Sequence, residues 1–126
     1  MLPYDFMLAE TDPELVVMQL DLCWIVAAGK DPVAYFDRYP GRFPLVHVKD
    51  WVNDGSISSG YDGALGQPVR VTGRLADVGQ GRIDWPRIFS QSGKGGIKHY
   101  FVEHDEPTFA FESIKASYNY LHGLRF

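Results

Sequence analysis

The sequence predicts an α/β domain built around a parallel sheet, and three observations lead to this class. Short β-branched and aromatic segments alternate with helical segments along the chain. Several helical segments have a proline near their start or a glycine beyond their end. Each of three strand segments ends in charged or imidazole side chains. Strands that alternate with helices favour parallel pairing through right-handed crossovers, which places helices over the sheet.

The expected elements follow from the hydrophobic pattern and from capping residues. Asp31 and Asp84 are placed to cap helix N-termini, with Pro32 and Pro86 in the first turns. Gly123 is placed to end the last helix. In chain order we expect a helix over 4–10, a strand over 16–22, a helix over 33–39, a strand over 43–48, a helix between Asp84 and Gly93, a strand over 99–102 and a helix over 110–122.

Two segments need a separate interpretation. Residues 51–81 are rich in glycine and lack periodicity, so they are expected to form a long functional or mobile loop. Within this loop, residues 68–75 are a weak candidate for a short hairpin or an extended arm. In the last helix, four apolar residues recur at helical spacing and are expected to pack on the sheet. They are Phe111, Ile114, Tyr118 and Leu121.

Composition excludes several classes of protein. The 126 residues are enough for one domain and too few for two, so 1–126 is treated as a single domain. The longest strictly apolar run, 22–28, is far too short to cross a bilayer, and the N-terminus lacks a basic segment. Neither a membrane helix nor a signal peptide is therefore expected. The net charge of −4 and the lack of a basic block argue against a nucleic-acid partner. The single cysteine, Cys23, rules out an intramolecular disulfide and agrees with a cytoplasmic location.

Three of the strand-end residues form a candidate metal site. Asp21 lies near the end of the first strand, His47 lies near the end of the second, and Glu103 follows the third. Functional side chains gather at the carboxyl ends of parallel strands, so these three are expected to converge. Two carboxylates and one imidazole suit manganese, magnesium or a similar divalent ion better than a structural zinc. The pattern leaves other roles open: Asp21 as a turn cap, His47 as a hydrogen-bonded rim histidine, and Glu103 as a solvated loop residue.

Motif segments follow one another in order through nearly the whole chain. They are Leu20-Asp21-Leu22-Cys23-Trp24, Ala28-Gly29-Lys30-Asp31-Pro32-Val33, Tyr39-Pro40-Gly41-Arg42-Phe43, His47-Val48-Lys49-Asp50, Val78-Gly79-Gln80-Gly81-Arg82-Ile83-Asp84-Trp85 and Tyr100-Phe101-Val102-Glu103-His104-Asp105. In this combination the chain resembles the C-terminal part of the sugar phosphate isomerase/epimerase family, whose members have a xylose-isomerase-like (β/α)8 TIM barrel. The resemblance implies a partial TIM barrel of about three parallel βα units, the last strands of the barrel.

The resemblance also implies a metal centre and a reaction. Family members hold a divalent ion with Glu, Asp, His and Glu from successive strand ends. They interconvert ketoses or related polyols by proton transfer through an enediolate. Asp21, His47 and Glu103 match the last three ligands, and Glu103 also matches a catalytic acid-base group. Mn2+ is the expected ion, with Mg2+, Co2+ and Zn2+ as alternatives, and a sugar or polyol is the expected small-molecule partner.

Other positions depart from the family pattern or extend it. The first glutamate ligand has no counterpart in this sequence, because it would precede the first helix. Trp24 stands three residues after Asp21, where many epimerases have a histidine, and is expected either to line the substrate site or to belong to the core. Lys49 and Asp50 follow the second strand. They are expected to contact the substrate or, alternatively, to form ion pairs on a polar rim.

Three βα units make an incomplete barrel, because a complete one has eight units and typically about 250 residues. The exposed sheet edges are expected to be covered by a second copy of the chain or by a separate N-terminal half. Two functions remain open at this point. One is a metal-dependent sugar isomerase or epimerase, active if the first glutamate ligand is supplied. The other is a non-catalytic ligand-binding or assembly module derived from the same barrel.

Overall fold

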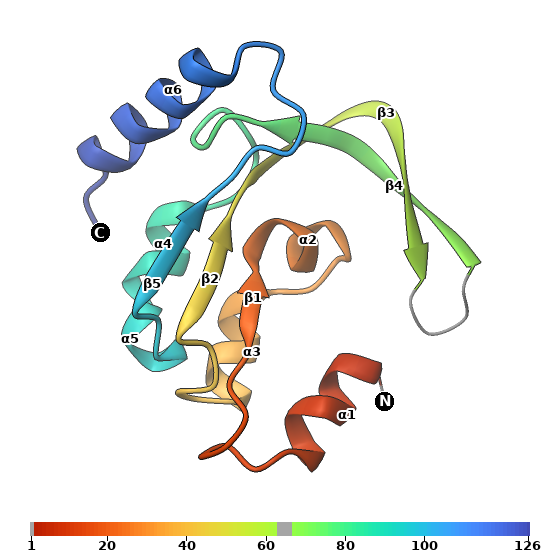
Figure 1. Cartoon of the computed structure of the whole chain (residues 1–126), viewed down its shortest axis with the longest axis vertical. Helices are drawn as coiled ribbons and strands as arrows, with labels where there is room; N and C mark the ends of the chain where they lie inside the picture. The colour runs from red at the N-terminus through yellow and green to blue at the C-terminus, as the bar shows by residue number, and fades with distance from the viewer. Residues whose placement is uncertain (1, 63–66) are drawn as a thin grey trace.

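The computed structural model describes the backbone of residues 2–62 and 67–126, and the side chains outside 56–71. It contains a three-stranded parallel sheet in the order β1-β2-β5 and a two-stranded antiparallel ribbon, β3-β4 (Figure 1). The predicted α/β class with a parallel sheet is confirmed. The elements are α1 (Pro3–Glu10), β1 (Gln19–Asp21), α2 (Leu22–Ala27), α3 (Pro32–Arg38), β2 (Leu45–Val48), β3 (Asp50–Asp62), β4 (Gln67–Ala76), α4 (Trp85–Ser90), α5 (Ser92–Gly95), β5 (His99–Val102) and α6 (Ala110–Gly123).

Aspartate caps determine where three of the helices begin. Asp31 caps α3 by accepting a hydrogen bond from the backbone N–H of Val33, and Asp84 caps α4 in the same way through Arg87, so both predicted caps are confirmed. Asp21 caps α2, which begins at the next residue. The strand expected over 16–22 therefore ends at Asp21, and the apolar run that follows it forms a helix instead.

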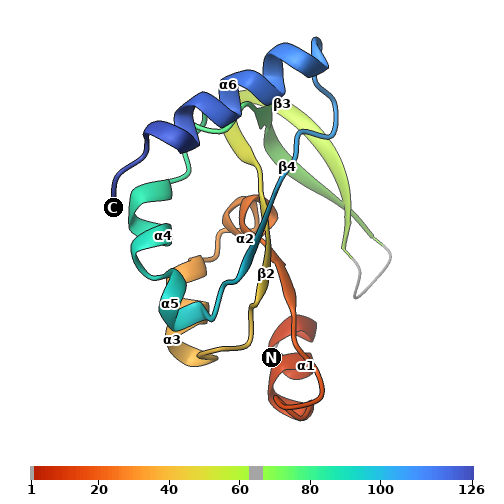
Figure 2. The ribbon, with the colours of Figure 1, turned by 60° about the vertical axis from the view of Figure 1, so that its left-hand side comes forward.

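The register of the sheet gives its two faces different roles. Leu20, Val46 and Tyr100 are aligned across the three strands, and Val46 is fully buried. Asp21 and His47 are aligned on the opposite face. Because side chains alternate along a strand, one face of β2 packs in the core while the other is free to carry polar groups. Figure 2 shows α3, α4 and α5 together on one side of the sheet. Among the described side chains, the largest fully buried ones are Trp85, Phe36, Phe43, Leu8, Leu22 and Ile88.

An antiparallel hairpin occupies most of the segment that was expected to be a long loop. β3 pairs with β4 from Asp50 opposite Ala76 to Asp62 opposite Gln67, with an irregularity between Val52 and Ile57. The weakly expected extended arm over 68–75 is part of this ribbon, and residues 63–66 lie outside the described part of the chain. The hairpin projects beyond the ends of the parallel strands (Figure 1). A single residue, Lys49, separates the end of β2 from the start of β3.

The apolar stripe of α6 lies on the opposite side from the one we predicted. Phe111 is 86% exposed and Ile114 is 65% exposed, and Tyr118 is exposed as well. The prediction that these three side chains pack on the sheet is wrong, and of the four only Leu121 packs against the core. Although α6 is the longest helix in the described residues, neither it nor any other described helix is long and apolar enough to cross a membrane.

Two serines explain this orientation of α6. Ser113 and Ser117 are buried on the inner side of the helix. The Ser117 hydroxyl accepts a hydrogen bond of 3.0 Å from the backbone N–H of Val78, and the Ser113 hydroxyl donates to the Asp77 carboxylate. A buried backbone N–H without a partner would cost about 1 to 3 kcal/mol, which favours the serine face over the apolar one in this contact.

Candidate functional site

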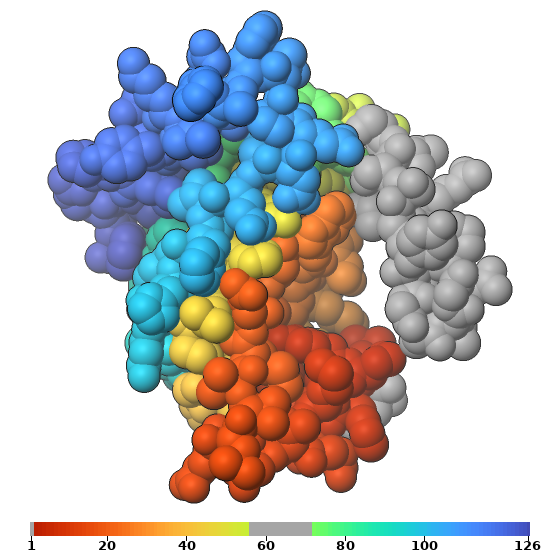
Figure 3. Space-filling view, in the orientation of Figure 1, coloured from red at the N-terminus to blue at the C-terminus, as the bar shows by residue number. Residues whose placement is uncertain are grey.

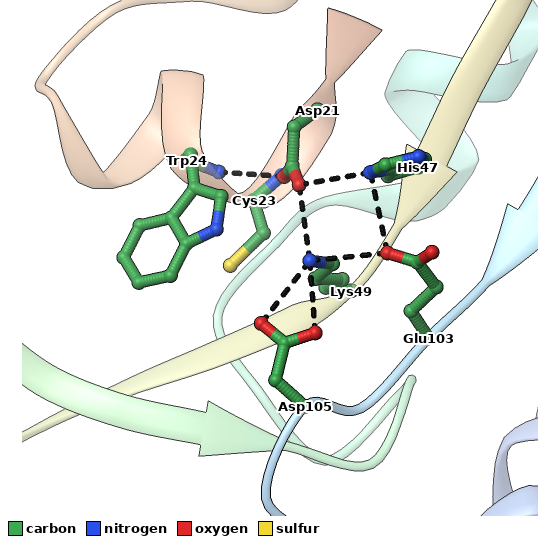
Figure 4. Close-up of polar contacts among 7 residues, drawn as sticks. All are labelled: Asp21, Cys23, Trp24, His47, Lys49, Glu103 and Asp105. Carbon is green, nitrogen blue, oxygen red and sulfur yellow. Dashed lines mark hydrogen bonds and ion pairs between the residues drawn. The ribbon is translucent and has the colours of Figure 1, made fainter.

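Asp21, His47 and Glu103 converge at the carboxyl ends of the three parallel strands, as predicted from the sequence (Figure 4). Their ligand atoms all lie within 4.8 Å of one another. His47 Nδ1 is 3.3 Å from Asp21 Oδ2 and 3.2 Å from Glu103 Oε2. Asp21 and His47 are brought together by the β1–β2 register, and Glu103 continues the β5 ladder by donating its backbone N–H to Val48. Strand polarity therefore assembles the cluster.

The spacing and chemistry of this cluster fit one divalent ion. Atoms that share an ion at about 2.1 Å stand about 3 Å apart when they lie at right angles around it. The two distances measured from His47 Nδ1 are close to this value. Carboxylate oxygens and an imidazole nitrogen are ligands that manganese, magnesium, cobalt and zinc accept to different degrees. The residues present can therefore hold such an ion.

Asp21 uses its two carboxylate oxygens for different purposes. Oδ1 accepts hydrogen bonds from the backbone N–H groups of Cys23 at 3.0 Å and Trp24 at 2.9 Å. Oδ2 points into the cluster, towards His47 and Lys49. The cap on α2 thus fixes the orientation of the oxygen that is available to a ligand. The turn-capping role that the sequence left open for Asp21 exists beside the role in the cluster.

Lys49 is a fourth member of the cluster. Its Nζ lies 3.0 Å from Glu103 Oε2, 3.3 Å from Asp21 Oδ2, and 3.0 and 3.1 Å from the two oxygens of Asp105. Burial lowers the pKa of Lys49, but hydrogen bonds to Asp105 and Glu103 outweigh that effect, so the net pKa is raised. Lys49 is therefore a permanent cation, and the three carboxylates around it leave the cluster with excess negative charge.

Asp50 lies apart from the cluster and is fully buried. Its Oδ1 accepts from the backbone N–H groups of Trp51 at 2.8 Å and Ile83 at 3.3 Å. Its Oδ2 accepts from the Gly79 N–H and the Trp85 indole, both at 2.9 Å. A residue without exposed surface cannot touch a substrate, so this geometry does not agree with the expected substrate contact. Asp50 instead ties the start of β3 to residues 79–85.

A cavity of about 420 Å³ opens beside the cluster. Trp24 is partly exposed in this cavity, so the structure supports a place for it on the site wall rather than in the core. Asp105 lines the same cavity and connects it to the cluster through Lys49. The remaining lining residues are Trp51, Arg74, Leu75, His104, Glu106 and Thr108.

Sequence reasoning did not identify several of these residues. Phe101 is aligned with His47 across the sheet, and its ring stands edge-on to the imidazole with 6.3 Å between centroids. Trp51 and Arg74 reach the cavity from the hairpin, of which the sequence predicts only a weak extended arm over 68–75. Asp105 had a signal, because it stands two residues after Glu103 and therefore on the same side of an extended segment. No comparable signal exists for Arg74.

Cys23 has the environment of a packing residue and not of a nucleophile. The side chain is fully buried at the start of α2. Burial, together with the nearby Asp21 carboxylate, raises the pKa of the Cys23 thiol to about 12. The reactive thiolate form is therefore strongly disfavoured at neutral pH.

Comparisons with known proteins agree with this fold. No protein-family model matches the chain. It is 27% identical over 99 residues to an inosose dehydratase of Lacticaseibacillus casei, a match that covers 78% of this chain and 33% of that protein. A sugar phosphate isomerase/epimerase from Parabacteroides distasonis ATCC 8503 superposes with a TM-score of 0.69 and 29% identity, covering 96% of this chain and 35% of that one. A second structure with the same description and source gives a TM-score of 0.68 and 29% identity, covering 96% of this chain and 36% of that one.

The chain spans about a third of the length of these relatives. The match to the solved structures nevertheless includes nearly all of its own residues. The resemblance inferred from the motif segments is thereby confirmed. In sequence and in fold, the chain is similar to one part of the sugar phosphate isomerase/epimerase proteins.

Proposed function

We propose that the chain carries the metal centre of a divalent-metal-dependent sugar isomerase or epimerase, which transfers a proton on a ketose or related polyol through an enediolate. The observation that carries this proposal is the convergence of Asp21, His47 and Glu103 at one end of the sheet. The similar proteins are named for a sugar phosphate and for an inosose. These names support the proposal that the substrate is a small polyhydroxylated molecule. Mn2+ is the ion that we expect at this donor set.

Each residue of the site has a distinct role in the proposal. Asp21, His47 and Glu103 hold the ion, which would polarise a carbonyl or hydroxyl oxygen next to the reacting carbon. Glu103 also moves the proton, because its Oε1 has no partner among the described residues while Oε2 faces the cluster. Trp24 contacts the substrate from the wall of the cavity. Lys49, which pairs with the cavity-lining Asp105, is assigned a substrate contact as well. A two-base epimerisation needs a second acid-base group, which we assign to another chain.

Binding of Mn2+ tests the metal site directly. We expect the purified chain to bind one Mn2+, measured by calorimetry or by electron paramagnetic resonance of the free ion. Glu103→Gln keeps the shape of the side chain but removes its charge, and we expect it to weaken binding by about 100-fold. Glu14→Gln, an exposed position at the other end of the chain, is the control and should bind as the wild type does. Unchanged affinity in Glu103→Gln would contradict the assignment of the ligands.

Exchange of carbon-bound hydrogen separates an enzyme from a binding module. Proton transfer through an enediolate replaces hydrogen with deuterium when a ketose is incubated in D2O, and nuclear magnetic resonance detects the change. An active site would catalyse this exchange only with Mn2+ present and with Glu103 intact. Binding of Mn2+ and polyol without any exchange would favour the non-catalytic module over the enzyme.

We further propose that a second copy of the chain covers an exposed apolar surface, the β5–α6 face, formed by Tyr100, Val102, Ile114, Tyr118 and Phe126. These side chains are exposed, and Val102 borders one hollow together with Ile114 and another together with Tyr100 and Phe126. Figure 3 shows atoms of β5 and α6 side by side at the surface. β5 is also the last strand of its sheet, so its outer edge can pair with another strand.

The chain exposes more surface than a compact monomer of its mass. The accessible surface is 7957 Å², whereas a compact monomer of 14.2 kDa exposes about 6,800 Å². This excess of about 1,200 Å² belongs to the chain as a whole, and the exposed side chains of the β5–α6 face contribute to it. Two β5 edges can meet antiparallel around a twofold axis, which makes the contact self-complementary.

Light scattering at micromolar concentration tests this association. We expect the wild-type chain to be a dimer and Ile114→Glu to be a monomer, because a charge on the β5–α6 face would be desolvated in the contact. Leu15→Glu places the same charge at another highly exposed apolar position, far from this face, and should leave the dimer intact. A well-folded wild-type monomer would contradict the proposal.

A further inference from the structure

The ammonium of Lys49 contacts carboxylate oxygens that a bound metal ion would also need. Its Nζ lies 3.3 Å from Asp21 Oδ2 and 3.0 Å from Glu103 Oε2. These are the same two oxygens that lie beside His47 Nδ1 (Figure 4). The ammonium and a divalent ion therefore compete for the same carboxylate oxygens.

The charge of Lys49 acts on these oxygens from a nearly buried position. Only 8% of its side chain is exposed, against 20% for Asp21 and 37% for Glu103, so water screens these attractions only in part. Two carboxylates that share one imidazole would repel each other if no cation stood between them. The ammonium of Lys49 offsets that repulsion and so stabilises the two carboxylates while no metal ion is bound.

Asp105 is an alternative ion-pair partner for the ammonium of Lys49. The ammonium lies 3.0 and 3.1 Å from the two oxygens of Asp105, which is not one of the three clustered ligands. The Asp105 carboxylate is about half exposed and lines the cavity beside Trp24, so there is room on that side. A lysine has a flexible four-carbon stem, and its ammonium can therefore move towards Asp105 while the backbone of β2 stays in place.

We propose that Lys49 is a displaceable counter-ion of the metal site. Its ammonium holds Asp21 and Glu103 together before a divalent ion binds, and it moves onto Asp105 alone when the ion takes their oxygens. This proposal rests on the proposed metal site and adds to it a positioning residue that competes with the metal. Only charges rearrange, and no covalent bond forms or breaks.

Mn2+ affinity in a set of variants tests this exchange. Lys49→Met keeps most of the length of the side chain without its charge, and we expect it to bind Mn2+ about tenfold more tightly than the wild type. Lys49→Gln is measured beside it, so that a folding defect in one neutral variant does not decide the result. Lys49→Arg keeps the competing cation and should bind within about threefold of the wild type. Lys94→Met removes a lysine that pairs with Asp37 on α3, and should leave the affinity unchanged.

Asp105 distinguishes displacement from simple charge repulsion. Asp105→Asn should weaken Mn2+ binding about tenfold, because Lys49 would lose its alternative partner. In the background of Lys49→Met, the same change should have less than about a twofold effect, because Asp105 then has no ammonium to receive. Thermal unfolding provides a second readout: Lys49→Met should melt lower than the wild type without metal and gain more from added Mn2+.

The outcomes separate this proposal from the proposed function. Equal or weaker Mn2+ binding by both neutral variants of Lys49 would overturn the counter-ion role while leaving the metal site in place. An Asp105→Asn effect of equal size with and without Lys49 would also overturn it, since Asp105 would then act through its own charge. No Mn2+ binding by the wild type or by any Lys49 variant would overturn the metal site itself, and the counter-ion role with it. Binding by the neutral variants alone would support the competition.

Discussion

Replacing Asp50 with asparagine is expected to lower the free energy of unfolding by about 3 kcal/mol. The carboxylate is fully buried and accepts four hydrogen bonds, two on each oxygen. An asparagine would present an amide N–H2 to two of these donors and leave them without an acceptor. Because three of the four donors lie in residues 79–85, we expect this segment to detach from β3 first.

Urea unfolding followed by circular dichroism measures the effect of Asp50→Asn. Asp37→Asn is the matched control, because it removes one carboxylate from an exposed ion pair with Lys94 and should cost less than about 1 kcal/mol. A loss below about 1 kcal/mol in Asp50→Asn would contradict the structural role. If the variant also failed to bind a polyol while remaining fully stable, Asp50 would be a substrate residue after all.

Replacing Phe36 with alanine is expected to lower the free energy of unfolding by about 3 to 5 kcal/mol. Phe36 is fully buried on α3, and its ring lies 5.8 Å from that of Phe43, centroid to centroid. Gly95 packs directly on the Phe36 ring, so α5 closes over it without room to collapse further. The loss of the ring would leave a cavity between α3, α5 and the sheet.

The same urea experiment, at one protein concentration for all variants, tests Phe36→Ala. Phe6→Ala is the control, because Phe6 is an exposed phenylalanine on α1 whose removal should cost less than about 1 kcal/mol. Similar stability of the two variants would show that α3 is not docked through Phe36. A large loss in Phe36→Ala alone would confirm that the helical layer over the sheet depends on this ring.

Much of the fold could be predicted because its signals are local. Asp31 and Asp84 cap their helices through residues two and three positions ahead, a distance that sequence shows directly. The metal cluster could also be predicted, although its members are far apart in the chain. Parallel strands end at the same edge, so Asp21 and His47 were expected to meet, and the register that pairs them is shown by the structure.

The parts that could not be predicted depend on distant partners. Ser113 and Ser117 turn α6 because they bond to residues 77–78, and no pattern within the helix records those partners. Phe111 and Ile114 do lie at helical spacing, but their side chains are exposed and do not pack on the sheet. Asp50 had a usable signal, since neighbours in an extended chain point in opposite directions and Lys49 already faces the cluster.

The alternation of buried and site-facing side chains along β2 also limits where residues can be inserted or deleted in the chain. Val46 and Val48 fill the core while His47 and Lys49 face the cluster, and both sets depend on the same count of residues. Insertion or deletion of a single residue in this strand would reverse the facing of every strand residue on one side of the change, which would place valines in the site or charges in the core. Natural length variation should therefore accumulate in the hairpin and be excluded from residues 45–50.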